Sequence, residues 1–165
     1  MLVPDAPLMS KLTVVRVARQ ADADLLVGWH ADPDVARYWG GRTFTRGQML
    51  ARLTRDDVAP YIIQEAGEPV GYLQAWSDAD QPDSCGLDMF LIPSARRRGL
   101  GPDAAQTIAH WLLAAGRVRR LTVDPELSNE HAIKGWEKAG FRAVGKRRAD
   151  QKHSAPWLLM AMDRA

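Results

Sequence analysis

A short stretch rich in arginine and glycine separates two apolar segments of the chain, at Arg96-Arg97-Arg98-Gly99-Leu100-Gly101. The segment before it, residues 85–92, has the apolar and aromatic content of a buried strand. After Pro102, apolar residues recur at helical spacing until Gly116, which ends the predicted helix. Glycines at the start of a helix let backbone N–H groups face an anion at the positive end of the helix dipole, and arginines add charge there. The stretch therefore predicts a strand, an anion-binding loop and a helix in direct succession.

Similar patterns predict the other elements of the chain. Strands are predicted at residues 12–18, 61–66, 70–76, 119–124, 141–147 and 157–162, and helices at residues 22–32, 45–53 and 128–140. Gly67-Glu68 lies between two of these strands and predicts a hairpin. We expect a single mixed α/β domain over residues 1–165, with a loose N-terminus at residues 1–11.

Composition excludes several classes of protein. The formal net charge is +2 and the basic residues form short clusters, which is not the pattern of a nucleic-acid-binding protein. The single cysteine, Cys85, has no Cys or His near it at metal-ligand spacing, so neither a disulfide framework nor a metal site is predicted. No apolar run reaches the roughly 20 residues of a membrane span, and the opening residues lack the pattern of a signal peptide. We expect a cytoplasmic protein with no membrane or nucleic-acid partner.

Three interpretations compete for the loop at residues 96–101. The letters from Gly99 to Ala104 match the dinucleotide pattern G-x-G-x-x-A, and Asp124 follows about 20 residues later at a predicted strand end. Against a Rossmann domain, the segment "PSARRR" separates the strand from Gly99, and a hairpin precedes that strand. A P-loop is excluded because no Lys-Ser/Thr pair follows the glycines. The pyrophosphate of an acyl-CoA and a solvated basic turn without a ligand are the other two interpretations.

Two motifs, which follow one another along the chain, resemble the two acetyl-CoA signatures of the GNAT superfamily of N-acetyltransferases. The first is Arg96-x-x-Gly99-x-Gly101 after "GLDMFLIP", and the second is "SNEHAIKGWEKAGF". Within that superfamily, "PYIIQEAGEPVGYLQAW", "LTVDPELSNEHAIKGWEKAGF" and "YWGG" at residues 38–41 are similar to aminoglycoside 6′-N-acetyltransferases. The resemblance implies a mixed, mostly antiparallel central sheet that splays near its middle and is flanked by helices. It also implies acetyl-CoA as co-substrate, an aminoglycoside or other cationic amine as acceptor, and a monomer or homodimer.

The resemblance also implies where acetyl-CoA binds. The pantetheine arm pairs with the backbone after the splay of the sheet, the loop amides take the pyrophosphate, and the helix of the second motif flanks the pantetheine and acetyl end. The implied cofactor-binding residues are Phe90, Leu91, Ile92, Arg96, Arg97, Arg98, Gly99, Leu100, Gly101, Pro102, Asn129 and Trp136. Two positions depart from the family pattern: Trp136 stands where a tyrosine is usual, and Arg97 where a glycine is common.

The acceptor side is predicted from charge. The interval between Ala75 and Arg96 contains no Lys or Arg and four acids, Asp78, Asp80, Asp83 and Asp88, so we expect an acidic cleft that suits a cationic amine. An acid in the middle of a strand, such as Asp88, is unfavourable unless it is paired or functional. The resemblance gives Asp88 the role of binding and deprotonating the reacting amine. The predicted substrate-binding residues are Trp39, Gln74, Trp76, Asp78, Asp88, Asp124 and Glu126. The alternatives are loop solubility for Asp78, Asp80 and Asp83 and core packing for the two tryptophans.

The leading function is acetyl transfer from acetyl-CoA to the 6′-amine of an aminoglycoside, by direct transfer in a ternary complex. Another amine, such as a siderophore hydroxylysine, a polyamine or a protein N-terminus, is the first alternative, because one fold serves many acceptors. A sensor that binds CoA without turnover is the second, because an indole at position 136 cannot donate a proton as a phenol can.

Overall fold

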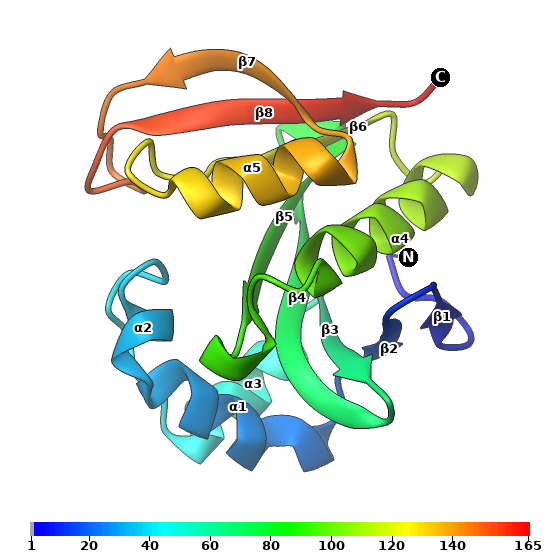
Figure 1. The fold of residues 1–165 in the computed structure, drawn as a ribbon, viewed down its shortest axis with the longest axis vertical. Coiled ribbons are helices and arrows are strands. Elements are labelled where there is room, and N and C mark those ends of the chain that lie inside the picture. The colour runs from blue at the N-terminus through cyan, green and yellow to red at the C-terminus, as the bar shows by residue number, and fades with distance from the viewer. Residues whose placement is uncertain (1) are drawn as a thin grey trace.

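The computed structural model describes residues 2–165, apart from the side chain of Asp78. Within this part of the chain, eight strands form one sheet in the order β1-β2-β3-β4-β5-β6-β8-β7 (Figure 1). The strands are β1 (Leu8–Met9), β2 (Val14–Val17), β3 (Val58–Glu65), β4 (Glu68–Asp78), β5 (Gln81–Leu91), β6 (Arg120–Val123), β7 (Arg142–Arg147) and β8 (Trp157–Asp163). The helices are α1 (Ala23–Ala31), α2 (Pro33–Ala36), α3 (Arg46–Leu53), α4 (Leu100–Ala114) and α5 (Glu130–Ala139), with 3-10 turns at Gln20–Asp22 and Pro93–Ala95.

The sheet is antiparallel except where β5 pairs with β6. That parallel pairing covers only Ser84 to Gly86 on β5, and β5 then continues to Leu91 without a partner on this side. Figure 1 shows the result: β3, β4 and β5 run down the molecule, while β6, β8 and β7 lie across its top. The prediction of a mixed, mostly antiparallel sheet that splays near its middle is therefore confirmed.

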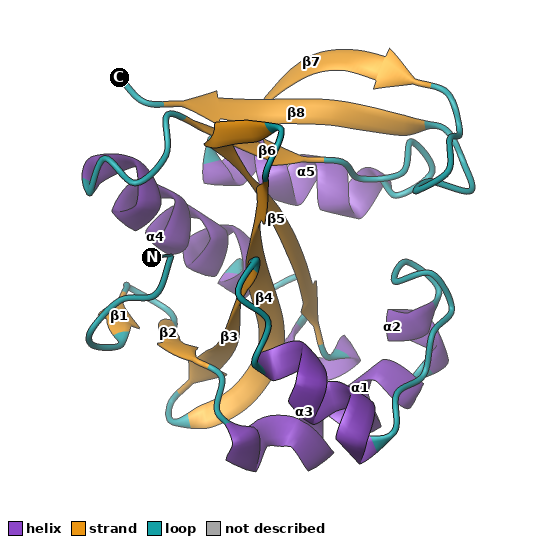
Figure 2. Ribbon diagram, turned by 180° about the vertical axis from the view of Figure 1, so that it is seen from behind, coloured by secondary structure: helices purple, strands orange, loops and turns teal. Residues whose placement is uncertain are grey.

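Alternation along the strands divides the core between the two faces of the sheet. Tyr61 and Ile63 of β3 pack with α4 and α5, whereas Ile62 faces the other way and packs with α1, α2 and α3. Successive strand residues point to opposite faces, so the uninterrupted apolar run of β3 indicates a strand covered on both sides. Figure 2 shows these two helix groups on either side of the central strands. The site described below lies where β5 leaves β6.

Most predicted elements are present, with shifted ends. The hairpin turn is made by Ala66 and Gly67, both with positive φ (49° and 84°), and Glu65 pairs with Glu68. This pair of left-handed residues matches the right-handed twist of the strands. The segment before residue 12, which we expected to be loose, instead contains β1 paired with β2, and the Tyr61 hydroxyl donates a hydrogen bond to the Leu2 carbonyl. Apolar side chains in that segment also pack against the core, which is the physical reason for the difference.

None of the helices in residues 2–165 is both long enough and apolar enough to span a membrane.

Candidate active site

Asp88, the predicted catalytic residue, lies on β5 opposite Gln74 of β4. Gln74 Nε2 donates a hydrogen bond to Asp88 Oδ2 at 2.7 Å. The Gln74 side chain is buried, and its Oε1 accepts hydrogen bonds from the Tyr72 hydroxyl at 3.1 Å and from Arg52 Nη2 at 3.0 Å. Because two donors occupy the amide oxygen, the amide nitrogen faces the carboxylate. The position of Asp88 is thus fixed through Gln74 by two further side chains.

The surroundings of Asp88 make it a stronger base than an exposed aspartate. Burial raises the pKa of Asp88 from 3.8 to about 6, against the hydrogen bond from Gln74, and the negative charge of Asp124 adds to the rise. The positive charge of Arg52 and a hydrogen bond from Trp76 act in the opposite direction. A carboxylate with such a pKa is still ionised at neutral pH. Asp88 can therefore take up a proton there.

Trp76 forms a flat wall beside Asp88. Its indole lies over Gly86 of β5, where an added Cβ would come within 2.0 Å of the ring. Trp76 is partly exposed, and Lys152 Nζ lies 5.6 Å from its ring centroid. Gly86 therefore provides the space that lets this indole lie across the sheet and reach the carboxylate.

Trp39, the other predicted acceptor-side indole, is part of an aromatic cluster. Its ring centroid lies 5.3 Å from His30, 5.7 Å from Tyr72 and 5.3 Å from Phe90, all in edge-on contacts. Burial lowers the pKa of His30, so its ring is neutral. Trp39 is partly exposed, so it joins the cluster to the surface. Packing is the role that these contacts support directly.

Asp124 follows β6 and faces the loop between β7 and β8. His153 Nε2 lies 2.8 Å from Asp124 Oδ2, and His153 Nδ1 lies 2.8 Å from Asp150 Oδ1. Burial favours the neutral imidazole, but the hydrogen bonds to the two carboxylates together raise the pKa of His153. The His153 ring also stacks on Trp157 with centroids 4.2 Å apart. Asp124 is thus engaged by a histidine that favours the charged form.

The other two predicted acidic residues of the acceptor side are Glu126 and Asp78. Glu126 accepts a hydrogen bond from the Ser128 hydroxyl at 3.2 Å, and its backbone forms a bridge with Trp157. Asp78 is the last residue of β4, and its side chain lies outside the described part of the structure.

The loop before α4 presents a row of unpaired backbone donors. The N–H groups of residues 97–101 have no acceptor in the part of the chain that the structure describes, and Pro102 has no N–H. Gly99 caps the helix with a φ of 79°, and Arg97 adopts a φ of 62°. Both values lie in the left-handed region, where glycine is favoured. The geometry explains why a glycine is expected at position 97, and it leaves five consecutive donors at the positive end of a helix.

The arginines of this loop have different neighbours. Arg96 Nε donates to the Leu91 carbonyl at 3.0 Å, Arg97 Nη2 lies 3.3 Å from His131 Nε2, and Arg98 pairs with Glu65. Gly101 is buried, and a Cβ there would lie 3.3 Å from Met89 Cε. Crowding at Gly101 would therefore first affect the packing of α4 on β5.

The free edge of β5 lies directly before this loop. The Ile92 N–H donates to the Val70 carbonyl, so the backbone of Ile92, and by alternation that of Phe90, faces β4. The backbone of Leu91 points to the open side instead. Phe90, Leu91 and Ile92 were predicted to pair with an extended ligand, but of these three only Leu91 directs its backbone away from β4, toward the side where β6 has diverged. The Leu91 carbonyl accepts a hydrogen bond from Arg96.

Two residues of the second motif have structural partners. Asn129, rather than the expected Ser128, caps α5, because its Oδ1 accepts from the Ala132 N–H at 3.2 Å. Trp136 is buried in the core and packs edge-on against Phe141 with centroids 5.3 Å apart. The contacts of Trp136, which the resemblance places among the cofactor-binding residues, are thus those of a core side chain.

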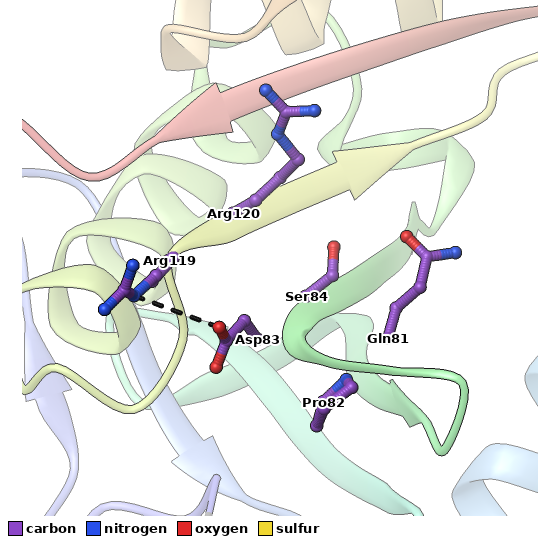
Figure 3. Close-up of a pocket in the computed structure, with 6 residues that line it drawn as sticks. All are labelled: Gln81, Pro82, Asp83, Ser84, Arg119 and Arg120. Carbon is purple, nitrogen blue, oxygen red and sulfur yellow. Dashed lines mark ion pairs between the residues drawn. The ribbon is translucent and has the colours of Figure 1, made fainter.

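The acidic interval of the sequence does not produce a purely acidic cleft. Arg52 and Lys152, from distant segments, lie beside Gln74 and Trp76. Asp83 instead lines a separate pocket of about 240 Å³ at the start of β5, where it lies 3.9 Å from Arg119 Nε (Figure 3). This pocket lies at the opposite end of the β5–β6 pair from the splay.

Sequence reasoning missed Tyr72, Arg52 and His153. Tyr72 could have been found, since it precedes Gln74 by two residues and so shares its face of β4. Arg52 and His153 reach the site from α3 and from the β7–β8 loop, and no local pattern marks them.

Comparison with known proteins agrees with this geometry. A sequence profile of the acetyltransferase (GNAT) domain matches residues 18–149. Aminoglycoside N(6′)-acetyltransferase type 1 of Klebsiella pneumoniae is 28% identical over 149 residues, which cover 79% of this chain and 74% of that protein. Lysine N-acyltransferase MbtK of Mycolicibacterium paratuberculosis is 29% identical over 176 residues, covering 96% of this chain and 78% of that protein.

A solved structure of AAC(6′)-Ib in complex with paromomycin and acetyl-CoA superposes with a TM-score of 0.81 and 26% identity, and covers 93% of this chain and 94% of that chain. The sheet splays after Gly86, a helix with free N-terminal amides follows β5, and the family profile spans most of the sequence. On these grounds the chain belongs to the GNAT acetyltransferase family.

Proposed function

We propose that the protein is an acetyl-CoA-dependent N-acetyltransferase whose acceptor is the 6′-amine of an aminoglycoside. The observation that carries the proposal is the position of Asp88: a fixed carboxylate with a raised pKa, on the strand that leads from the splay to the amide-rich loop. The similarity to aminoglycoside acetyltransferases supports the choice of acceptor.

The residues around the loop fit acetyl-CoA. The five N–H groups at residues 97–101, which have no acceptor among the described residues, suit a pyrophosphate. The Leu91 N–H on the open side of β5 suits an extended amide-containing arm, whose own donor would have to share or replace Arg96 at the Leu91 carbonyl. When bound there, acetyl-CoA supplies an acetyl group activated as a thioester. Arg97 and Arg96 add positive charge beside the amides. Trp136 packs in the core and carries no proton in this proposal.

The chain's own residues position and deprotonate the amine. Gln74 holds Asp88, and the carboxylate binds an ammonium group, then accepts a proton directly or through one water. Trp76 offers a flat surface for a sugar ring beside the carboxylate. Two reactants held side by side gain rate from proximity, so no acyl-enzyme is needed.

The test is release of free CoA from acetyl-CoA with kanamycin, and with an aminoglycoside that carries a 6′-hydroxyl in place of the amine. We expect release only with the 6′-amine, and a loss of about 10²–10⁴ in turnover for Asp88→Asn. Asp83→Asn is the matched control, because this acid lies on the same strand but in the separate pocket. Equal release with both aminoglycosides would contradict the choice of the 6′-amine.

A thermal melt with acetyl-CoA and with NAD separates the alternatives. Acetyl-CoA at a hundredfold excess over its dissociation constant should stabilise the fold by about 2.7 kcal/mol, and NAD should not. Stabilisation by acetyl-CoA without CoA release on any amine would favour a sensor, and stabilisation by NAD alone would restore the dinucleotide interpretation.

A further inference from the structure

A second pocket lies next to the residues that hold Asp88. It has a volume of about 390 Å³ and is lined by Arg42, Thr43 and Phe44 of the loop before α3, by Gln48, Ala51 and Arg52 of that helix, and by Arg55 just after it. Ala51 and Arg52 lie three and four residues after Gln48, so the three helical residues share one face of α3. None of these residues belongs to the site predicted from the sequence.

The lining of this pocket is strongly positive. Three arginines and no acidic residue line it. Arg55 is paired with Asp57 outside the pocket, at 2.5 Å between Nη2 and Oδ2. Arg42 has no ion-pair partner among the described residues. Arg42 is exposed and adds little by itself, whereas Arg52 is partly buried.

Arg52 is a partly buried guanidinium that forms no ion pair among the described residues. The charges of Asp88 and Asp57 act on it only through space. Its contacting polar groups, on Gln74 and Tyr72, are both neutral, and burial raises the pKa of Tyr72 to about 12. Its guanidinium carbon lies 5.4 Å from the centroid of the Phe44 ring, and its Nε is buried with no acceptor among the described residues. A buried charge is costly unless it is paired, and guanidinium groups match carboxylates in shape. An anion in the pocket would supply the missing partner.

The same guanidinium connects the pocket with the reacting centre. Arg52 donates to Gln74, and Gln74 donates to Asp88, so two hydrogen bonds separate them. On the other side of the cleft His153 engages Asp124, and Lys152 lies over Trp76. The surface around Asp88 is therefore bipolar, with a carboxylate at the centre and guanidinium groups beside it. Such a surface complements a molecule that carries both an amine and an anion.

We propose that the pocket binds the carboxylate of amino-acid-like acceptors, so that the enzyme also acetylates amines that carry a carboxylate several bonds away. This rests on the proposed acetyl transfer at Asp88. The transfer forms the amide N–C bond and breaks the thioester C–S bond. The electron pair of the broken bond leaves on the CoA sulfur, and Asp88 takes the proton that the amine loses. Arg42 and Arg52 hold the carboxylate in the pocket meanwhile.

The test uses matched acceptors that differ only in charge. The probes are ω-amino acids with three to six methylenes and the primary amide of each, measured by CoA release beside kanamycin. One length should give a KM about tenfold to a hundredfold lower for the acid than for its amide, which corresponds to a hydrogen-bonded charge pair. Equal KM values for every acid and amide pair would overturn the proposal.

Two substitutions test whether the preference for acids over amides arises in this pocket. Arg42→Gln should remove most of the advantage of the acid without changing the KM for its amide. Arg37→Gln is the control, because this exposed arginine lies 5.1 Å from the Tyr38 ring centroid and outside the pocket. An acid preference that survives Arg42→Gln unchanged would assign the carboxylate to another place and overturn the proposal.

A thermal melt in the presence of CoA keeps this inference separate from the proposed function. Release with kanamycin but no preference for acids would leave the proposed function standing and overturn the pocket. Stabilisation by the acid but not by its amide, without CoA release from any amine, would support carboxylate binding in the pocket and overturn acetyl transfer to aminoglycosides and amino acids alike.

Discussion

Asp88 holds a charge in surroundings that favour its neutral form. Because the folded pKa is raised from 3.8 to about 6, kcat/KM for the acceptor should rise with pH up to about 6 and then level. The raised pKa also means that this carboxyl stabilises the fold in its neutral form, and that this contribution is lost as pH rises through about 6.

Asp88→Asn should therefore be more stable than the natural protein at about pH 7.5, by on the order of 1–2 kcal/mol after allowing for partial exposure, and should show no such gain at about pH 4. Urea denaturation at both pH values and a pH profile of kcat/KM are the measurements. A variant that unfolds would instead give the carboxylate a structural role, and a flat profile would contradict its role as base.

Gly86 determines where Trp76 lies, and the substitution Gly86→Ala, which adds one methyl group, tests this. In Gly86→Ala the new Cβ would lie within 2.0 Å of the indole, so the ring has to move away from Asp88. We expect a loss of stability of about 1–3 kcal/mol from overpacking and a higher KM for the acceptor, with acetyl-CoA affinity retained.

Gly28→Ala on α1 is the matched control for this substitution, because nothing lies within 4 Å of a Cβ there. It should stabilise the fold by about 0.5–1 kcal/mol, since alanine favours a helix over glycine. Melts and steady-state kinetics of both variants decide the point. An unchanged acceptor KM in Gly86→Ala would show that Trp76 is not part of the acceptor site.

At the scale of elements, the turn before α4 combines a strained residue with a functional position. Arg97 has a φ of 62°, which costs an ordinary residue roughly 1–2 kcal/mol. Arg97→Gly should therefore be more stable than Arg97→Ala, by about 1 kcal/mol, although both lose the side chain.

Measuring the acetyl-CoA affinity of the two Arg97 variants separates the role of the backbone of this turn from that of the Arg97 side chain. If the pyrophosphate is bound mainly by the amides of residues 97–101, the two Arg97 variants should bind within about tenfold of the natural protein. Ala66→Gly, compared with the natural protein, is the control. Ala66 also has a positive φ, of 49°, but it lies in the β3–β4 hairpin, so this substitution should relieve strain without changing acetyl-CoA affinity. Equal melts for Arg97→Gly and Arg97→Ala would show that the turn is not strained.

The elements themselves could largely be predicted, because apolar periodicity and caps are local properties. The strand at residues 85–92, the loop and the following helix are present as predicted, and so is the hairpin of β3 and β4. Helix ends depend on which side chain wins a hydrogen bond, so Asn129 rather than Ser128 caps α5. β1 has two residues and owes its place to β2, which no local pattern indicates.

The candidate site could be predicted only in part, for a similar reason at the scale of the whole molecule. Asp88 could be predicted because an acid in the middle of a strand is unfavourable without a role. Gln74 could be predicted because it lies on the neighbouring strand, β4. Arg52 and His153 come from segments far away in sequence and change the electrostatics of the cleft. An acidic interval in the sequence therefore did not give an acidic surface. The positive pocket beside Gln74 could be found only once the fold was known.

The two arms of the splayed sheet are bridged by the β7–β8 loop. The parallel pairing of β5 with β6 ends at Gly86. Beyond it, the loop contacts both arms, because His153 engages Asp124 after β6 and Lys152 lies over Trp76 of β4. The stability of this bridge should depend on pH. Since the folded pKa of His153 is raised above 6.5, its contribution is fully present below about pH 6.5 and is lost as pH rises through the folded value.

His153→Gln keeps a hydrogen-bonding side chain but cannot become charged. The free energy of unfolding of the natural protein should exceed that of the variant most at about pH 6, and the difference should shrink by about pH 9 and at high salt. Urea denaturation at the two pH values gives both differences. His110→Gln is the control for the substitution itself, since His110 is exposed on α4 and has no ion-pair partner among the described residues. A difference for His153→Gln that stays constant with pH would mean that packing on Trp157, rather than charge, holds the loop across the two arms.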